Sequence, residues 1–488
     1  MTNNNSMQCK PSYRLLTEAQ IKKIHSASLN ILETIGVRVS HTKGVQLLKE
    51  AGCRVKDGNI VQIPSDLVEE CIRSAPSQVT IYKRNGEEAM RLEGRNNYFG
   101  TGTDLLRTLD LTTDEMRLSV IQDVANAAIV SDYCENVDFI ASFALPSDVP
   151  SNLQYFKNVK TMLENSIKPI FFTAAGKEDL FLIIEMAEIV AGGEKALTEK
   201  PFLIHYSEPT SPLTHSYGAV SKVLLCAEKG VPICYPPGAL LGASCPVTLA
   251  GGIAQTNAEA LSGVVIHQLK RKGAPIISGV GVVPLDMRTA TFSYGAPETR
   301  LTNSAFADIF HYYNLPMWST VGSDAHCLDQ QASMEHAFGT LIAALDGANL
   351  IHDIGYLGQG LLGNPVSIVM CDEIINYVKR FINGFDIDRE KMALDVIRDV
   401  GPGGEYLTEK HTLKHFREEI WIPKFLNRDD PMSWINKRRT NYGEKVKQKT
   451  LEILKTHHPD PLAEGVIQKI NKVANKAEKE LMDIQFVA

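Results

Sequence analysis

The sequence predicts a (β/α)8 TIM barrel, preceded by an N-terminal α/β extension and followed by a C-terminal helical segment. Eight short apolar runs, rich in β-branched and aromatic residues, recur from about Asn97 onward. Helix-period segments separate them, and the runs start about 30 to 43 residues apart, enough for one helix and two loops. Apolar strands alternating with amphipathic helices indicate parallel strands buried on both faces. Eight such units fit a closed barrel better than an open doubly wound sheet.

The N-terminal extension is expected over residues 1–95. The stretch LTEAQIKKIHSASLNILETIGVRVS predicts a helix with Thr17 at its N-cap and Gln20 three residues later, which is the pattern of a capping box. Gly36 ends this pattern, because glycine readily adopts the left-handed conformation that terminates a helix.

The barrel itself is expected over residues 96–371, with a helical region rich in lysine and glutamate over 372–488. No G-x-G-x-x-G or G-x-x-x-x-G-K motif follows the first strand, which disfavours a nucleotide-binding domain. A long helical flank typically closes a barrel end or builds a subunit interface, and a homo-oligomer is expected. The eight strands are expected to begin at Asn97, Val137, Lys168, Pro201, Val231, Ala274, Pro316 and Leu350.

Composition and charge narrow the function classes. The chain has 488 residues, 44% of them hydrophobic and 22% charged, which is ordinary for a globular protein. A net charge of −7 argues against nucleic acid as a partner. The nine cysteines show no C-x-x-C spacing, so neither a disulfide framework nor a zinc ribbon is indicated. With no signal-peptide core and no apolar run near the ~20 residues of a membrane span, a soluble, cytoplasmic protein is expected.

Candidate site residues follow the apolar runs, because barrel enzymes build their sites at the carboxyl ends of strands. Aromatic faces together with one or two carboxylates bind quaternary ammonium groups by cation–π attraction. Each aromatic residue could instead pack in the core, and the outcome depends on strand register, which the sequence does not fix. The aromatic candidates are Tyr98, Phe143, Tyr206, Tyr235 and Tyr356, and the polar candidates are His205, Glu208, Arg288, Asp324, His326 and His352.

The stretch SDAHCLD has three interpretations. Its carboxylates and His326 could bind a divalent metal, but no H-x-H after the first strand supplies further ligands. It nearly matches D-x-H-x-x-G, the cobalamin-binding motif, yet Asp329 stands where that motif needs glycine, so direct corrinoid ligation is not expected. It can also be a loop in which Asp329 caps the next helix. Arg288 has a similar alternative as the partner of Asp286 in a rim ion pair.

Five longer stretches of the chain are HYSEPTSPL (205–213), YPPGALLGASCPVTLAGGIAQTNAEALSG (235–263), PLDMRTATFSYGAPE (284–298), GSDAHCLDQQA (322–332) and GPGGEYLTEKHTLKHFR (401–417). Jointly they resemble the trimethylamine methyltransferase family of corrinoid-dependent enzymes. The resemblance spans nearly the whole chain and implies a (β/α)8 barrel. Founding members carry pyrrolysine in the barrel, whereas a larger branch lacks it and demethylates quaternary amines such as glycine betaine, proline betaine or carnitine. This chain has only standard residues, and the pyrrolysine position falls near His326, so it resembles the second branch.

The resemblance implies a methyltransferase that moves a methyl group from a quaternary amine, glycine betaine first, to Co(I) of a corrinoid (cobalamin). A cognate partner protein would present the corrinoid, and no tightly bound cofactor is expected in this chain. The leaving group is a neutral amine, so no general acid is required. Asp324, His326 and Glu208 are the candidate catalytic residues. The aromatic candidates would form a cage, and Arg288 or one of the histidines would bind a betaine carboxylate.

Two other functions remain open on the sequence alone. A metal-dependent barrel hydrolase or lyase could use the same fold, and so could a non-catalytic barrel that binds a quaternary ammonium ligand. Chelator sensitivity would identify the first, and ligand binding without methyl transfer would identify the second.

Overall fold

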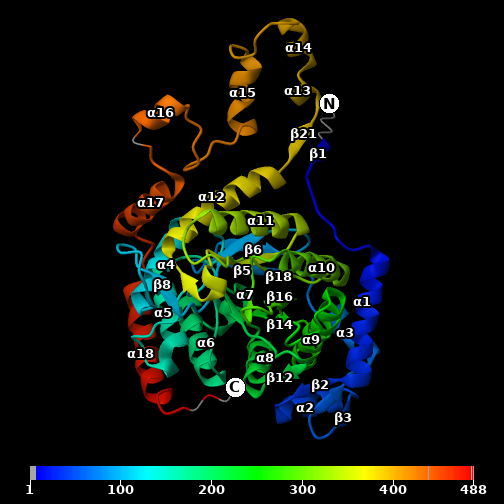
Figure 1. Cartoon of the computed structure of the whole chain (residues 1–488). Coiled ribbons are helices and arrows are strands. Elements are labelled where there is room, and N and C mark those ends of the chain that lie inside the picture. Colours follow the sequence, from blue (N-terminus) through cyan, green and yellow to red (C-terminus); the bar gives the residue numbers. More distant parts are fainter. Residues whose placement is uncertain (1–6, 438, 485, 487–488) are drawn as a thin grey trace.

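A closed ring of parallel strands forms the centre of the computed structural model, which describes residues 7–437, 439–484 and 486 (Figure 1). Parallel bridges from Gly100 to Phe139 and from Ile140 to Ile170 make residues 139–140 the eighth strand position and close the ring. Every strand lies within one of the eight predicted runs, so the predicted (β/α)8 fold is confirmed. The other seven strands form one sheet in the order β10 (Ile170–Phe172), β11 (Leu203–Tyr206), β13 (Ile233–Cys234), β15 (Ile276–Gly279), β18 (Met317–Thr320), β19 (Leu350–Ile354) and β7 (Tyr98–Thr101).

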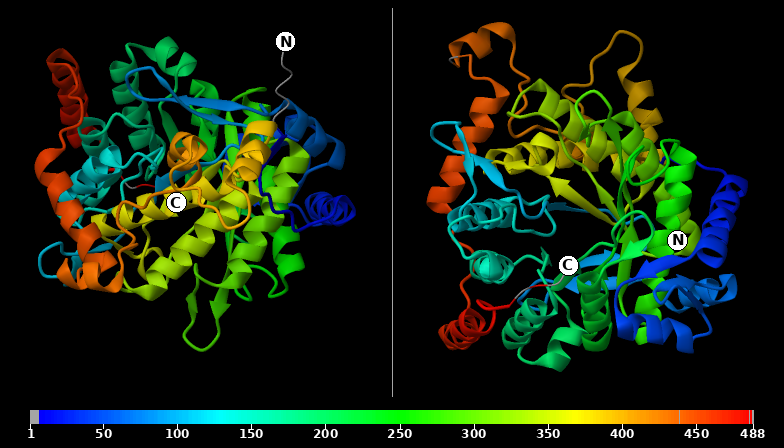
Figure 2. Two further views of the ribbon diagram at one scale, coloured as in Figure 1. Left: turned by 90° about the horizontal axis from the view of Figure 1, so that it is seen from above. Right: turned by 60° about the horizontal axis from the view of Figure 1, so that its bottom comes forward.

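Helices surround the strands, as the right-hand view in Figure 2 shows. Each strand position is followed by a helix that buries its apolar face against the ring, which is why both faces of the strands are apolar. A short additional helix, α7 (Glu194–Glu199), follows the third barrel helix. The eight barrel helices are α4 (Ile121–Tyr133), α5 (Gln154–Asn165), α6 (Lys177–Ala191), α8 (Tyr217–Lys229), α9 (Leu249–Lys270), α10 (Pro297–Tyr313), α11 (Gln330–Asp346) and α12 (Pro365–Ile382).

A hairpin closes the amino end of the barrel. Strands β5 (Val79–Tyr82) and β6 (Glu88–Leu92) pair antiparallel, and their apolar side chains join the cluster that fills the barrel interior. Two small sheets stand on the opposite, carboxyl side of the ring, because β14 and β16 continue beyond β13 and β15 along the chain. The first sheet contains β14 (Gly238–Leu241), β16 (Gly281–Asp286) and β17 (Thr291–Phe292). The second contains β8 (Arg107–Leu109), β9 (Met116–Leu118) and β20 (Leu362–Gly363).

The N-terminal extension begins with the predicted capping box. The hydroxyl of Thr17 accepts from the backbone N–H of Gln20, and the Gln20 side chain accepts from the backbone N–H of Thr17 at 2.8 Å. Helix α1 (Glu18–Asn30) then continues through a π-helical turn, 31–35, and ends at Gly36, whose φ is 84°. The remaining elements are β2 (Val37–Val39), α2 (Thr42–Glu50), β3 (Arg54–Lys56), β4 (Ile60–Gln62) and α3 (Ser65–Ser74), and β2 also pairs with β12 (Thr214–His215).

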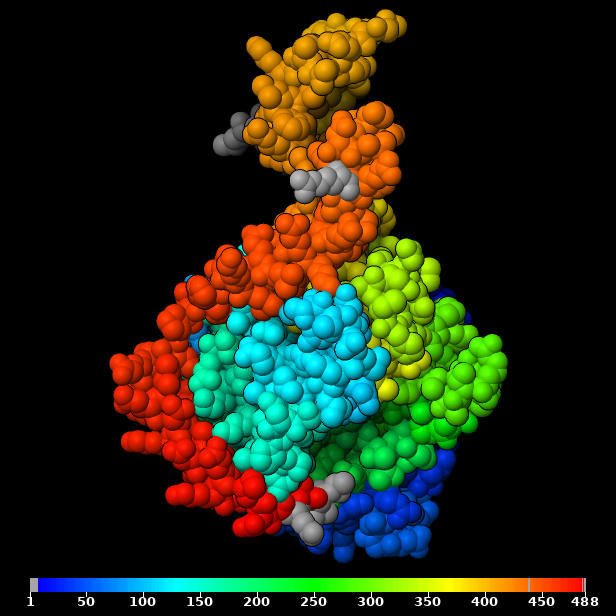
Figure 3. All heavy atoms as spheres, turned by 60° about the vertical axis from the view of Figure 1, so that its left-hand side comes forward, coloured from blue at the N-terminus to red at the C-terminus, as the bar shows by residue number. Residues whose placement is uncertain are grey.

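The C-terminal region leaves the barrel as an arm and then returns to it. The expected boundary at residue 371 falls inside α12, because this eighth barrel helix packs on α11 and α4 and runs to Ile382. The next elements stand away from the barrel (Figures 1 and 3). They are β21 (Phe385–Ile387), which pairs with β1 (Met7–Cys9), then α13 (Arg389–Met392), α14 (Leu394–Val400), α15 (Lys410–Glu419) and α16 (Pro431–Asn436).

Two longer helices bring the chain back along the barrel. Helix α17 (Tyr442–Thr456) packs on α4 and α12, and α18 (Glu464–Glu480) packs on α6. The helices of this region are interrupted at VGPGGEYL (400–407) and HHPDPL (457–462), since α14 ends at Val400 and α17 at Thr456. Over residues 7–437, 439–484 and 486, no helix combines the length and apolarity that crossing a membrane requires.

Lys168 joins the carboxyl end of α4 to the neighbouring strand positions. Its Nζ donates to the backbone carbonyls of Ser131, Cys134 and Val137, each at 2.6 Å. Burial lowers the pKa of this ammonium group. A cation at a helix C-terminus is favourable because the last carbonyls of the helix carry no intrahelical partners.

We expect Lys168→Met to lower the free energy of unfolding by about 2–4 kcal/mol, because three carbonyls lose a charged donor. Urea unfolding followed by circular dichroism measures the change. The matched control is Lys160→Met, which removes only the i,i+4 pair with Glu164 at 2.5 Å and should cost at most about 0.5 kcal/mol. Equal losses in the two variants would contradict the structural role of Lys168.

Candidate active site

A cavity of about 280 Å³ lies at the carboxyl end of the barrel. Its walls come from the ends of β11, β18 and β19, from strands β14, β16 and β17, and from the loops after β7, β17 and β19. Glu208 is exposed and Phe292 is half-buried, so the cavity opens to solvent. The residues that line it are Thr103, Tyr206, Glu208, Gly238, Ala239, Leu240, Gly281, Val283, Phe292, Tyr294, Trp318, Thr320, His352, Asp353 and Tyr356.

Five aromatic residues of this lining, Tyr206, Phe292, Tyr294, Trp318 and Tyr356, form what we call the aromatic cage. The ring centroids of Tyr206 and Trp318 are 5.9 Å apart, and those of Tyr294 and Tyr356 are 6.3 Å apart. Phe292 packs edge-on against Tyr294 at 5.6 Å. Such a set of π-faces around a small volume attracts cations, each close ring contributing about 0.5–2 kcal/mol depending on desolvation.

His352 lies between the two halves of the cage. Its ring centroid is 5.8 Å from that of Tyr206, 5.9 Å from that of Trp318 and 6.4 Å from that of Tyr356. Its Nδ1 is 2.9 Å from Oδ1 of Asp353, but the two groups are not aligned for a hydrogen bond. Among the described residues, neither ring nitrogen of His352 has a hydrogen-bond partner.

Two carboxylates give the cavity a negative charge. Glu208 accepts a hydrogen bond from the hydroxyl of Tyr206, and Asp353 accepts one from the hydroxyl of Thr320. Solvent reaches Glu208 through the cavity mouth, but protein surrounds it elsewhere, and this partial burial raises the pKa of its carboxyl above the ordinary value. The charge of Asp353 raises that pKa further. The cavity therefore suits a cation.

Tyr356 is held in the cage by its hydroxyl group and by a close backbone. The hydroxyl accepts from the backbone N–H of Thr103 at 2.7 Å and donates to the carbonyl of the same residue. The ring also lies directly against Gly102, where an added Cβ would be 1.8 Å from Cε1 of Tyr356. Only glycine fits at position 102 while the ring keeps this place.

Asp324 positions Tyr294 and does not itself line the cavity. Its carboxylate accepts from the hydroxyl of Ser293 and from the backbone N–H groups of Tyr294 at 2.8 Å and Gly295 at 3.2 Å. Asp324 is one of the three candidate catalytic residues, and the contacts that the structure gives it are those of a loop anchor. His326 is exposed at the protein surface and is also absent from the cavity lining.

The helix-cap interpretation of the SDAHCLD stretch is confirmed. The carboxylate of Asp329 accepts from the backbone N–H of Ala332 at 3.1 Å and so begins α11. The ion-pair interpretation of Arg288 is confirmed as well: its Nη2 lies 2.7 Å from Oδ2 of Asp286, and its side chain is 88% exposed. In the described chain, no three histidine, cysteine, aspartate or glutamate side chains come together as a possible metal cluster.

Four of the predicted site residues lie away from the cavity, because of the strand end, the strand face or the loop on which each one stands. Tyr98 is at the amino end of the barrel, where its hydroxyl accepts from the backbone N–H of Arg91 at 3.0 Å. His205 and Tyr235 point outward into the helix layer. Phe143 is buried behind Tyr356, with ring centroids 6.4 Å apart. The predicted residues that do line the cavity are Tyr206, Glu208, His352 and Tyr356.

The sequence analysis missed three cage residues. Trp318 sits inside a predicted strand, and the rule of choosing residues just past each strand excluded it. Phe292 ends the hairpin built from β16 and β17, and Tyr294 follows it, so both residues lie far along the chain from the end of β15. Their stretch, PLDMRTATFSYGAPE, was one of the five long motifs, and this was the only signal that could have identified them.

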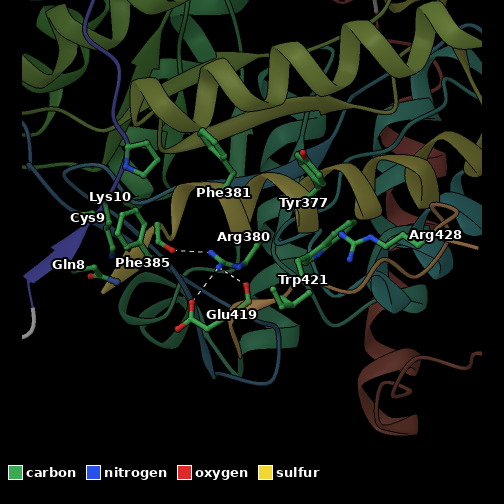
Figure 4. Close-up of a pocket in the computed structure, with 13 residues that line it drawn as sticks. Gln8, Cys9, Lys10, Tyr377, Arg380, Phe381, Phe385, Glu419, Trp421 and Arg428 are labelled. Atoms are coloured by element: carbon green, nitrogen blue, oxygen red, sulfur yellow. Dashed lines mark hydrogen bonds and ion pairs between the residues drawn. The ribbon is translucent and has the colours of Figure 1, made fainter. Parts of the chain in front are cut away.

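A larger cavity, about 970 Å³, lies outside the barrel between β1, the end of α12 and residues 419–428 (Figure 4). Arg380 lies at its centre and donates to the backbone carbonyls of Gly384 at 2.9 Å and Glu419 at 2.8 Å. This cavity contains no residue from the carboxyl end of a barrel strand. We therefore place the active site in the smaller cavity, where barrel enzymes carry their chemistry.

Fold and site together define a (β/α)8 barrel with an aromatic cavity, flanked by two carboxylates, at the carboxyl end of its strands. The family described as Trimethylamine methyltransferase (MTTB) matches residues 2–481, and the chain belongs to this family. A trimethylamine methyltransferase of Desulfitobacterium hafniense (strain DCB-2) is 30% identical over 466 residues, which cover 95% of this chain and 94% of the relative. A glycine betaine methyltransferase of strain Y51 is 30% identical over 479 residues, covering 97% and 99%.

A solved structure supports the fold. The monomethylamine methyltransferase of Methanosarcina barkeri superposes with a TM-score of 0.53, at 10% identity, covering 97% of this chain and 90% of that one. At this identity the likeness concerns the fold alone. Together with the family match, the named relatives make this chain a methyltransferase of a family that acts on methylamines or glycine betaine.

We expect Gly102→Ala to lower the affinity for tetramethylammonium at least about tenfold, because the new Cβ displaces the Tyr356 ring from the cage. Isothermal titration calorimetry measures the affinity, and circular dichroism checks that the barrel remains folded. Gly465→Ala is the control, since a Cβ there meets nothing within 4 Å. Unchanged affinity in Gly102→Ala would show that Tyr356 is not a wall of the binding site.

Proposed function

We propose that this methyltransferase takes its methyl group from a quaternary ammonium compound, with glycine betaine as the first candidate. The observation that carries the proposal is the aromatic cage with Glu208 and Asp353 beside it. A tetraalkylated nitrogen has no N–H to donate, so π-faces and nearby carboxylates are the groups that can recognise it. Proline betaine and carnitine present the same nitrogen and differ in the chain attached to it.

The methyl acceptor in this proposal is a corrinoid (cobalamin) carried by a separate partner protein, which supplies a Co(I) nucleophile. The cavity mouth is open at Glu208 and Phe292, so a partner can approach the bound amine from the carboxyl end of the barrel. The oligomeric state of this chain stays a prediction.

The cage orients and desolvates the ammonium group. Methyl transfer turns the cation into a neutral tertiary amine, so the leaving group needs no proton and no general acid is required. Positive charge disappears from the nitrogen during this step, and very tight cation binding would therefore stabilise the ground state more than the transition state. The cage contributes chiefly by holding the methyl group toward the open mouth and by excluding water.

The first test is a methyl-transfer assay with the purified chain and a reduced corrinoid protein from the same source. Glycine betaine, proline betaine, carnitine, choline and trimethylamine are screened for loss of the Co(I) absorption band. We expect one or more quaternary amines to respond while trimethylamine stays silent. Silence across all five, with an authentic methyl donor system active on the same corrinoid protein, would overturn the proposal. Binding without transfer would indicate a non-catalytic barrel, and loss of activity with chelator would indicate a metal enzyme.

We expect the affinity for tetramethylammonium to fall on acidification, because the pKa of Glu208 is raised and the cation binds best to the ionised carboxylate. Affinity is full above that raised pKa and is lost as the pH falls through it. Glu208→Gln should bind about tenfold more weakly at neutral pH and show little pH dependence. Calorimetric titrations from pH 5 to 8 measure both effects.

The control for this pH profile is Asp104→Asn. Burial raises the pKa of Asp104 to about 6, which lies within the pH range of these titrations. Its carboxylate is bonded to Ser142 and Thr173 and lines neither the cage nor its mouth. The pH dependence should persist in this variant. If the pH dependence disappeared in Asp104→Asn and persisted in Glu208→Gln, the titrating carboxylate would be Asp104 and not Glu208.

A further inference from the structure

A second cavity, about 390 Å³, adjoins the aromatic cage. Tyr206 and Glu208 line both cavities, so the two spaces meet at this pair. The residues that line only the second cavity are mostly small or polar: Tyr155, Thr173, Ala174, Ala175, Ser207, Thr210, Ser216, Gly218, Ala219 and Lys222. A substrate whose ammonium group sits in the cage can therefore extend past Tyr206 and Glu208 into a polar space.

Lys222 is the cation of this second cavity. It projects from α8, is half-buried, and its Nζ donates one hydrogen bond, to the carbonyl of Ala174 at 2.8 Å. Within the described residues no carboxylate oxygen lies within 4.0 Å of this Nζ. An ammonium group has three donors, so Lys222 can donate to a ligand as well. A partly buried ammonium without an adjacent carboxylate is a favourable partner for an anion.

The surrounding carboxylates are already engaged elsewhere. Asp179 accepts from the backbone N–H groups of Ala175 and Gly176, both at 2.7 Å. Asp104 accepts from two hydroxyl groups, and Glu208 accepts from Tyr206. All three carboxylates raise the pKa of Lys222 from a distance, whereas burial, the largest effect, lowers it. His205 is buried nearby, where burial holds its pKa well below the ordinary value, and it adds no positive charge.

The beginning of α8 provides a second feature that favours an anion. Ser216 is the N-cap of this 13-residue helix, and Gly218 and Ala219 of its first turn line the second cavity. The Ser216 hydroxyl already accepts from the backbone N–H of Ala219 at 3.2 Å. The N–H of Gly218 is one of the first-turn groups that lack an intrahelical partner, and the helix dipole places partial positive charge there. Anions bind at such helix ends when space is available. Lys222, one turn further along α8, adds a full charge on the same cavity.

We propose that the second cavity binds the anionic group of the substrate, and that Lys222 selects zwitterionic betaines over quaternary amines without a carboxylate. This inference rests on the proposed function, because it places the ammonium group in the aromatic cage. The nitrogen then lies beside Glu208 and the carboxylate beside Lys222, so each substrate charge faces its opposite. Lys222 contacts the carboxylate and not the transferred methyl group, which makes it a specificity-determining residue.

The test compares pairs of ligands that differ in the carboxylate. Affinities for glycine betaine and for trimethylammonium acids with two and three methylenes are measured by calorimetry against choline and tetramethylammonium. We expect wild type to prefer at least one acid over both carboxylate-free cations. Lys222→Gln should weaken binding of that acid about tenfold or more, the effect of one lost charged hydrogen bond, and leave tetramethylammonium within about twofold. Lys222→Arg should restore part of the preference.

The controls separate this inference from the proposed function. Lys195→Gln removes a lysine whose side chain is 89% exposed, and it should change the affinity neither for the acids nor for the carboxylate-free cations. Circular dichroism of each variant confirms folding. If Lys222→Gln lost the same affinity for the acids as for tetramethylammonium, or lost no affinity at all, the anion site would be overturned. If wild type demethylates choline or tetramethylammonium and prefers no acid, the quaternary-amine function stands and the anion site fails. If wild type neither binds nor demethylates any of the tested ligands, the quaternary-amine function and the anion site both fail.

Discussion

Closure of eight parallel strands into a ring is the constraint on which the site depends. Once residues 139–140 complete the ring, successive side chains of each strand must alternate between the barrel interior and the helix layer. In β11, Ile204 and Tyr206 face inward while Leu203 and His205 face outward. The same alternation in β18 and β19 turns Trp318 and His352 toward Tyr206. The cage is therefore a consequence of closure and register, with the hairpin at 281–292 adding its outer wall.

The strand and helix pattern could be predicted because it depends on local periodicity. All eight apolar runs contain a strand position, and the capping residues Thr17 and Asp329 begin helices as expected. The boundary at 371 was misplaced because α12 is apolar on one face and continuous through that point, with no glycine or proline to mark an end before Asn383. Local signals place elements well, but they do not say which helix is the last to pack on the barrel.

The active site was only partly predictable because a shift of one residue in register reverses the direction of every side chain. Tyr206, Glu208, His352 and Tyr356 were correctly placed at the cavity, whereas Tyr98, His205 and Tyr235 have the right chemistry on the wrong face or at the wrong end. Lys222 could not be found from strand ends at all, since it comes from a helix and reaches the site only through tertiary packing. Its position in the sequence of α8 does not distinguish it from a lysine on the surface of a helix.

The charges around Tyr206 are the physical reason for proposing that a zwitterion suits this site better than a simple cation. Partial burial raises the pKa of Glu208 and lowers that of Lys222, so the empty site disfavours the charged forms of both groups. A monocation compensates Glu208 and leaves Lys222 uncompensated. A zwitterion with its ammonium group beside Glu208 and its carboxylate beside Lys222 compensates both charges without changing the net charge of the cavity. When methyl transfer neutralises the nitrogen, the carboxylate still bound at Lys222 keeps the product amine oriented, so the specificity contact is retained while the cation contact is released.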